Sequence, residues 1–367
     1  MVLRVDGGCS HPGILPENET SIRELQTGEE ESWDAFAKTR PGSNLYHSTL
    51  WRDFVRQVFG HRPVYLVAER GGQLTGILPM FLVRAPFLGS KLISLPYDIG
   101  SGGTAAIDAC SASALLEAAI RRARELRVDY MELRYGAPQP AAATLGLGAS
   151  EPVIVSDLEL GDEKRVWSRL SRNHRRSIHT ARESGIQVRE AGSLEEYLEF
   201  YRIMLRVFRN FGTPPYGPGY IRAVWKHLHP AGAVRLLLAY AGGRPMGGAL
   251  LFCWGKAMVD KLCLTLPESV PLCANAALYA RTIELGLERG FETLNLGSSA
   301  RTQTGLIEFK EKWGATRRPA VCYALPIEGK VPAIEKYFDS NGLAQRMWRK
   351  LPVAVTPLGG VLHRWFC

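Results

Sequence analysis

The sequence predicts an α/β fold built from two similar domains in tandem, because one set of residues recurs at long range in the same order. VAERGGQLTG (67–76) aligns with LAYAGGRPMG (238–247) at an offset of about 171 residues, and LRVDYMELRYG (126–136) aligns with LERGFETLNLG (287–297). The first alignment places Ala68, Gly71, Gly72 and Gly76 opposite Ala239, Gly242, Gly243 and Gly247. Both halves read as strand, Gly-Gly turn, strand, further strand or loop, helix and strand. Duplication of one unit explains this better than the chance similarity of two hairpins.

Length and composition fit a globular protein of two domains or one large one. The chain has 367 residues, of which 46% are apolar and 22% charged, and a formal net charge of +9. Its seven cysteines form no C-x-x-C pair, which argues against zinc, against a disulfide framework and for a reducing compartment. No run of 18 apolar residues and no secretory leader pattern are found, so we expect a cytoplasmic protein without a membrane span.

The first half is expected to begin with a flexible lead-in over residues 1–20, followed by a domain over 21–156. Helical spacing is seen at 29–38, 50–59 and 111–127. Strands are predicted at 63–69 and 74–83, as a hairpin around Arg70-Gly71-Gly72-Gln73, and at 128–135. Residues 91–103 pass from apolar to Gly-rich without the spacing of a nucleotide-phosphate loop.

A basic segment lies between the two repeats. Residues 164–182, KRVWSRLSRNHRRSIHTAR, contain seven Lys and Arg residues and no acidic one. Read as one helix, the segment aligns Arg165, Arg169, Arg172 and Arg176 on one face, opposite Trp167, Leu170, Ile178 and Ala181. Such a row suits the phosphates of a sugar nucleotide, a lipid-linked pyrophosphate, coenzyme A or tRNA. A merely solvated basic face is the alternative.

The second half contains a loop and a helix N-terminus with binding potential. Residues 202–220 end a helix carrying Arg206 and Arg209 and enter a Gly/Pro-rich loop, where Thr213 and Tyr216 are candidate binding residues. A strand is predicted at 257–265. A helix follows at 275–289, whose first backbone N–H groups could bind an anion.

The most distinctive stretch is 289–315, RGFETLNLGSSARTQTGLIEFKEKWGA. It predicts a strand that ends in the turn Gly297-Ser298-Ser299, a polar loop over 300–305, and a helix over 306–313 carrying Lys310. A strand end, small residues and a lysine form a candidate site for an anionic or acyl group. In the alternative interpretation, Lys310 caps its helix or pairs with Glu308 or Glu311 on the surface.

Several motifs together resemble the FemAB-like group of the GNAT acyltransferase superfamily. They are LYHSTLWRDFV (45–55), LSRNHRRSI (170–178), NFGTP (210–214), ANAALY (274–279), FETLNLGSS (291–299) and GLIEFKEKWGA (305–315). The resemblance spans about residues 43–325 and is strongest to the subgroup associated with exosortase and exopolysaccharide gene clusters. It implies tandem GNAT-like domains over 21–156 and 157–326, with the acyltransferase site in the second and an extension over 327–367.

The resemblance further implies transfer of an acyl or aminoacyl group to an amine, on a cell-envelope polysaccharide or a peptidoglycan precursor. Acyl-CoA or aminoacyl-tRNA would be the co-substrate, and no cofactor would be bound permanently. Expected partners are a small-molecule or lipid-linked glycan acceptor, tRNA, and the inner face of the cell membrane as a peripheral contact. Lys310 and Phe309 match the family's F-K pair beside the acyl donor. The other candidate binding residues are Arg172, Arg176, Arg209, Thr213, Tyr216, Asn275, Tyr279, Ser298 and Ser299.

Three departures from the family pattern leave donor and acceptor open. Val55 stands where muropeptide-binding members tend to have lysine, and residues 266–276 lack the pyrophosphate loop of ordinary GNAT enzymes. Residues 200–231 also leave no room for the coiled-coil arm of some members. The rival interpretation is a non-catalytic module that holds an anionic glycan or nucleic acid through its basic helix; only turnover separates the two.

Overall fold

The computed structural model describes residues 19–85, 89–97, 102–332 and 342–360, and its contacts divide the chain into two compact units. The division falls between Val153 and Ile154 and again between Arg318 and Pro319, and residues 342–360 belong to unit 2. Of the predicted lead-in, residues 1–18 lie outside the described part. The ranges 21–156 and 157–326 remain a prediction of the folding domains. The contacts differ from these ranges in one respect, because residues 319–332 belong to unit 1.

Unit 1 is a sheet with the strand order β1-β2-β3-β4-β6-β14, in which only β4 and β6 run parallel. Two short strands, β5 and β7, pair with β3 and β14. The strands are β1 Ser21–Glu24, β2 Arg62–Arg70, β3 Gln73–Ala85, β4 Gly89–Ser94, β5 Ala105–Ala106, β6 Tyr130–Tyr135, β7 Gly148–Ala149 and β14 Thr316–Pro326. The helices are α1 Glu30–Lys38, the short 3₁₀ helix η2 Leu45–His47, α2 Thr49–Phe59, α3 Ala109–Glu125 and α4 Pro140–Thr144. The predicted helices and hairpin of the first half are confirmed to within a few residues at each end.

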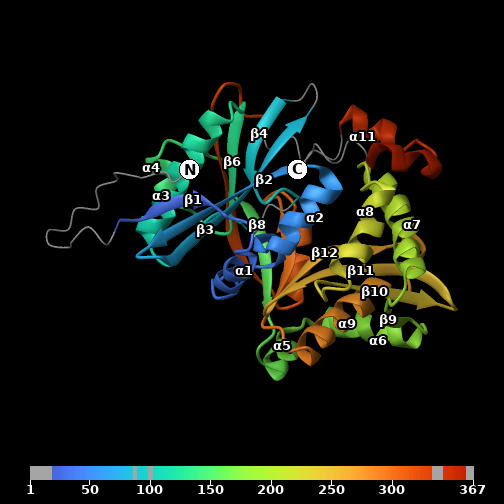
Figure 1. Ribbon diagram of the computed structural model, residues 1–367. Coiled ribbons are helices and arrows are strands. Elements are labelled where there is room, and N and C mark those ends of the chain that lie inside the picture. The colour runs from blue at the N-terminus through green and yellow to red at the C-terminus, as the bar shows by residue number, and fades with distance from the viewer. Residues whose placement is uncertain (1–18, 86–88, 98–101, 333–341, 361–367) are drawn as a thin grey trace. The chain divides into compact units, whose positions relative to one another are not determined.

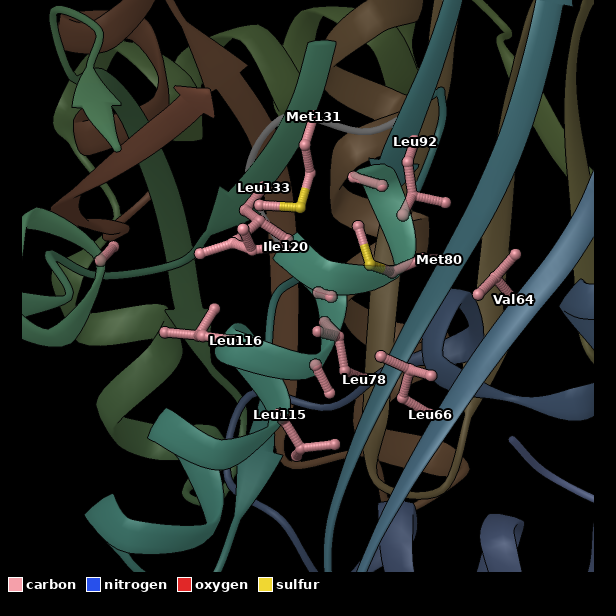
Figure 2. Packing of buried hydrophobic residues seen from close by; sticks show 14 of the residues in the cluster. Val64, Leu66, Leu78, Met80, Leu92, Leu115, Leu116, Ile120, Met131 and Leu133 are labelled. Carbon is pink, nitrogen blue, oxygen red and sulfur yellow. The ribbon is translucent and has the colours of Figure 1, made fainter. Parts of the chain in front are cut away.

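The core of unit 1 forms where α3 packs on the sheet. Leu115, Leu116 and Ile120 of α3 lie against the apolar side chains of β2, β3 and β6 (Figure 2). These residues recur at helical spacing in α3, whereas Val64, Leu66 and their neighbours alternate along strands. The apolar face of α3 and the apolar face of the sheet therefore pack against each other and form the core of unit 1.

Unit 2 repeats the arrangement with the order β9-β10-β11-β12-β13-β8, again with one parallel pair, β12 and β13 (Figure 1). Its strands are β8 Val153–Glu159, β9 Gln187–Glu190, β10 Val234–Ala241, β11 Arg244–Trp254, β12 Ala257–Thr265 and β13 Thr293–Ser299. Its α-helices are α5 Glu163–Arg169, α6 Arg172–Glu183, α7 Leu194–Phe211, α8 Pro218–Ala223, α9 Ala274–Glu288, α10 Thr304–Lys312 and α11 Leu343–Trp348. A π-helical turn η3 Val224–Leu228 and the 3₁₀ helices η4 Pro267–Ser269 and η6 Val353–Gly359 complete it.

The helices α9 and α7 cover opposite faces of the unit 2 sheet. Ala249 and Leu251 of β11 pack in the same cluster as α9. The opposite face of β11, on which Gly248 lies, is covered by α7, because a Cβ added at Gly248 would lie 2.7 Å from the ring of Phe200. Consecutive strand residues point to opposite faces, so the two helices sandwich this part of the sheet.

The duplication predicted from the sequence is confirmed in the hairpins. Ala68 pairs with Gly76 in unit 1 and Ala239 with Gly247 in unit 2, and a register shift directly follows each alanine. The turn glycines at 71, 72, 242 and 243 all have positive φ, as a tight two-residue hairpin turn requires. The recurring residues are therefore the ones that shape each hairpin.

The basic segment is not one helix, and this prediction is wrong. The backbone is extended at Leu170 and Ser171, and the Ser171 hydroxyl accepts a hydrogen bond from the His174 amide at 3.3 Å, which caps the start of α6. The Arg175 guanidinium donates to the carbonyls of Leu170 and Trp167 at 3.1 and 2.8 Å and so satisfies the end of α5. The four arginines expected in one row consequently belong to two helices.

In the described parts, none of the helices combines the length and apolar character that crossing a bilayer requires.

Candidate functional site

Strands β12 and β13 pair over a short distance and then lose contact. Their parallel ladder ends at Val259 and Asn295, although β12 continues to Thr265 and β13 to Ser299. Each strand also contains a bulge beyond this point. Lys261 is an extra residue against β11, and Leu296 and Gly297 together face one residue of β8. The two bulges lie where the strands stop pairing, and they re-aim the side chains and carbonyls around them.

Lys310 projects from α10 onto the β13 bulge. Only 4% of the residue is exposed, and its ammonium donates to the Gly297 carbonyl at 2.8 Å, the Ser299 hydroxyl at 2.9 Å and the Ser298 carbonyl at 3.4 Å. Burial lowers the pKa of Lys310 to about 8. The three contacts match the three protons of an ammonium group, so its positive charge is held in a fixed place.

The alternative that Lys310 is a surface lysine is wrong. Glu308 pairs with Lys312 at 3.7 Å, and Glu311 pairs with Arg317 at 2.5 Å. The turn predicted at Gly297-Ser298-Ser299 is instead the continuation of β13 through its bulge, with φ of +77° at Gly297. The helix begins at Thr304, two residues earlier than predicted.

Asp260 of β12, a half-buried residue whose Oδ1 atom is buried, is a carboxylate that the sequence analysis missed. Its Oδ2 accepts a hydrogen bond from the Tyr279 hydroxyl at 3.1 Å, and its buried Oδ1 has no hydrogen-bond partner among the described residues. Burial raises the pKa of Asp260 to about 6, opposed by the Tyr279 hydrogen bond and the charge of Lys310. One signal was available, because Asp260 is the sole acidic residue of the predicted strand 257–265.

Helix α9 lies across β12 and supplies Tyr279 and Asn275 one turn apart. Asn275 accepts a hydrogen bond from the Cys263 thiol at 3.4 Å, three residues along the strand from Asp260. Burial raises the pKa values of Tyr279 and Cys263 well above their usual range, so both side chains stay neutral and protonated near pH 7. The two candidates from this helix therefore line the same strand.

Phe309 takes part in an aromatic cluster beside this site. Its ring centroid lies 5.4 Å from that of Tyr279 and 5.3 Å from that of His174, and Trp313 stacks on Tyr279 at 5.2 Å. Burial lowers the pKa of His174, which favours the neutral ring in this apolar setting. Phe309 thus fixes the position of Tyr279 through packing.

The break between α5 and α6 is tied to the end of α10. The Ser171 amide donates to the Lys312 carbonyl at 3.0 Å. Gly314 has φ of +91°, and a Cβ there would come within 2.9 Å of Arg169 Cβ. The sequence motifs 170–178 and 309–315, far apart in the chain, are therefore neighbours in space.

The remaining candidates belong to α6, to α7 and to the loop after α7, and Tyr216 among them lies near the β12 bulge. Arg172 and Arg176 are exposed on the side of α6 opposite the buried His174. Arg209 donates through Nε to the Leu351 carbonyl at 2.7 Å, and Thr213 is exposed after the end of α7. Tyr216 is buried and stacks on Tyr220 at 4.1 Å, with Lys261 Nζ 5.9 Å from its ring centroid.

Residues 168–311 match the family model described as "Acetyltransferase (GNAT) domain". Among solved structures, FemX aligns with a TM-score of 0.67 and 14% identity over 84% of this chain and 97% of its own. L-PGS from Bacillus licheniformis aligns with a TM-score of 0.55 and 12% identity over 89% and 100% of the two chains. A tandem GNAT protein from the clavulanic acid biosynthesis pathway aligns with a TM-score of 0.53 and 13% identity over 86% and 100%. No curated protein matches the sequence.

The matched range runs from α5 to α10 and includes Asp260, Tyr279 and Lys310. Acyl transfer in general is the chemistry that this match supports. The chain accordingly has a tandem GNAT-like fold, and residues 168–311 within it match the model of a GNAT acetyltransferase domain.

Proposed function

We propose that the protein transfers an acyl or aminoacyl group from an activated donor to an amine, with the reaction centred on Lys310 and Asp260. The observation that carries the proposal is a buried carboxylate oxygen without a partner beside a buried ammonium, both where β12 and β13 stop pairing. A buried polar atom without a partner calls for an explanation, and a catalytic role is one of those known.

Asp260 is suited to remove the proton of the attacking amine. The amine nitrogen forms a bond to the donor carbonyl carbon, and its proton passes to Asp260 Oδ1. The C–S bond of a thioester, or the C–O bond of an aminoacyl ester, then breaks, and the leaving group keeps the electron pair. A carboxylate with a pKa of about 6 is still ionised at pH 7 and is a better base than an ordinary aspartate.

Lys310 is suited to stabilise the negative charge that develops on the carbonyl oxygen and the leaving group. Its three protons are already bound by the β13 bulge, so it would act through its fixed charge rather than as a mobile donor. A preorganised charge in a buried site costs no rearrangement during the reaction. Phe309 would be a positioning residue, and Ser299 would hold the ammonium in place.

For the donor we propose acyl-CoA or aminoacyl-tRNA, and for the acceptor an amine of a cell-envelope polysaccharide or peptidoglycan precursor in the cytoplasm. The GNAT domain match supports acyl-CoA, because GNAT domains use it as co-substrate. Arg172 and Arg176, exposed on α6, suit the phosphates of either donor. The motif resemblance to FemAB-like proteins supports the acceptor class.

The test begins with mass spectrometry of small molecules and tRNA that co-purify with the protein, followed by turnover assays with the donor so identified. Lys310→Met should lower turnover by about a hundred- to a thousand-fold, the usual cost of losing one such electrostatic group. Lys312→Met, an exposed neighbour on the same helix, is the control and should change turnover less than about twofold. Near-normal turnover of a folded Lys310→Met protein would remove Lys310 from the mechanism.

A further inference from the structure

Exposed apolar side chains gather on residues 342–360 and on the helix end that this segment contacts. Phe211, at the end of α7, is 55% exposed, and Met347, Val355 and Leu358 are 63%, 40% and 72% exposed. We call these four residues the C-terminal patch. They are more than half of the large apolar side chains that stand exposed in the described part of the chain.

The segment is a fixed part of unit 2. Arg349 donates to the Phe211 carbonyl at 3.2 Å, while Arg209 binds the Leu351 carbonyl. A Cβ added at Gly212 would lie 2.8 Å from the Gln345 carbonyl oxygen, which shows how closely the two backbones approach. Figure 1 shows the segment, drawn in red, beside the ends of α7 and α8. Its apolar residues are therefore held outward by specific contacts.

The surroundings of the patch are positively charged. Residues 342–360 contain Arg346, Arg349 and Lys350 and no acidic residue. Arg346 and Lys350 are exposed and flank Met347 in sequence. The chain continues with VLHRWFC, which adds apolar, aromatic and basic residues and again no acidic one.

We propose that the C-terminal patch docks unit 2 on a phospholipid bilayer that carries anionic headgroups. Single protruding apolar side chains next to arginine and lysine are suited to shallow insertion between headgroups, with the cations at the level of the phosphates. The absence of acidic residues from the segment gives it the charge complementary to an anionic surface. The inference does not depend on the proposed chemistry, although docking would bring the enzyme to acceptors carried on lipid.

The test is co-sedimentation of the full chain with vesicles of phosphatidylcholine alone and of phosphatidylcholine with 30% phosphatidylglycerol. The protein should bind only the anionic vesicles, and its binding should weaken as salt is raised. Charge-reversed R346E/K350E should bind at least tenfold more weakly, because each basic residue near the surface contributes about fivefold to partitioning. M347E/L358E should lose binding as well.

The matched control is Ile107→Glu, which changes a residue of unit 1 with 51% exposure and should leave vesicle binding as in the wild type. Equal binding of the wild type and both double variants, or no binding by the wild type, would overturn the proposal. Sedimentation velocity distinguishes one further outcome. Self-association that M347E/L358E abolishes, without vesicle binding, would assign the patch to a second copy of the chain instead.

Discussion

Two groups of opposite charge lie at the candidate site, Asp260 and Lys310. Burial shifts the pKa of each group in the direction that favours its neutral form. It raises the pKa of Asp260 to about 6 and lowers that of Lys310 to about 8. Each charge partly supports the other, and Tyr279 supports the carboxylate. Between the two pKa values both groups are ionised, which is the state that the proposed reaction requires.

Turnover should therefore follow a bell-shaped pH profile. Below about pH 6 Asp260 becomes protonated and cannot accept the amine proton, and above about pH 8 Lys310 loses its charge. The measurement is kcat/KM from pH 5 to 9.5, because kcat/KM reports the ionisation of groups in the free enzyme. In Asp260→Asn the residual rate should lose its acidic limb; an unchanged acidic limb would assign it to another group, such as the substrate amine.

Tyr279→Phe should move the acidic limb to higher pH. The Tyr279 hydroxyl stabilises the Asp260 carboxylate at 3.1 Å, so its removal raises the carboxyl pKa further. A hydrogen bond to a charged group contributes about 1.5 kcal/mol or more, which corresponds to about one pH unit. Tyr220→Phe, a second buried tyrosine of unit 2, serves as the control. An acidic limb that stays in place in Tyr279→Phe would contradict this role for the hydroxyl.

At the scale of the element, the β13 bulge decides where Lys310 is held. The bulge turns the carbonyls of Gly297 and Ser298 toward the ammonium, and it needs the positive φ of Gly297. The neighbouring helix α10 contributes the lysine, and α9 contributes Tyr279 over the facing strand. A bulge next to a functional group is a common way to re-aim backbone atoms.

Gly297→Ala should reduce both stability and turnover. A non-glycine residue at φ of +77° costs about 1–2 kcal/mol of unfolding free energy, and a shift of the bulge would displace the carbonyls that bind Lys310. Gly290→Ala is a matched control, because Gly290 has φ of +69° and open space around its Cβ position. Both variants should lower the melting temperature, but only Gly297→Ala should lower turnover by tenfold or more. A similar turnover in both would separate the bulge from catalysis.

At the scale of the whole molecule, the duplicated units differ in what occupies the end of their parallel strand pair. In unit 1 the β4–β6 ladder stops at Ile93 and Glu132, as the β12–β13 ladder stops in unit 2. There Ser94 accepts from the Arg134 amide at 2.9 Å, and the Arg134 side chain binds Glu132 at 2.7 Å. A Cβ at Gly102 would lie 2.7 Å from the Arg134 carbonyl oxygen. In unit 1, the end of the β4–β6 ladder, which corresponds to the site in unit 2, is thus occupied by the unit's own residues.

The chain should consequently bind one donor molecule and not two. Native mass spectrometry or isothermal titration with the identified donor should give a stoichiometry of one per chain. If the donor binds only in unit 2, substitutions in unit 2 should weaken its binding. The double variant Arg172→Glu/Arg176→Glu tests whether these two arginines contact the donor. Two equivalents of donor would mean that unit 1 keeps a working site.

The repeat, most helices and strands, and the motif that carries Lys310 could be predicted from the sequence alone. These features are local: hairpin glycines require positive φ, and apolar spacing distinguishes helix from strand. The break between α5 and α6 at Ser171 was not predicted, because a serine inside a helical pattern can be either an interior residue or an N-cap. Its partner at the end of α10 makes it a cap here.

The chemistry of the site, in contrast, became visible only in the folded protein. In the sequence, Asp260 is a single polar residue in a predicted strand. In the folded protein, Tyr279 of α9 donates a hydrogen bond to it, and the charge of Lys310 from α10 acts on it. Conversely, the sequence made Arg209 a candidate binding residue, but the structure commits its Nε to the backbone carbonyl of Leu351. Burial, unsatisfied atoms and shifted pKa values arise from contacts between residues distant in the chain. No pattern of spacing along the sequence contains them.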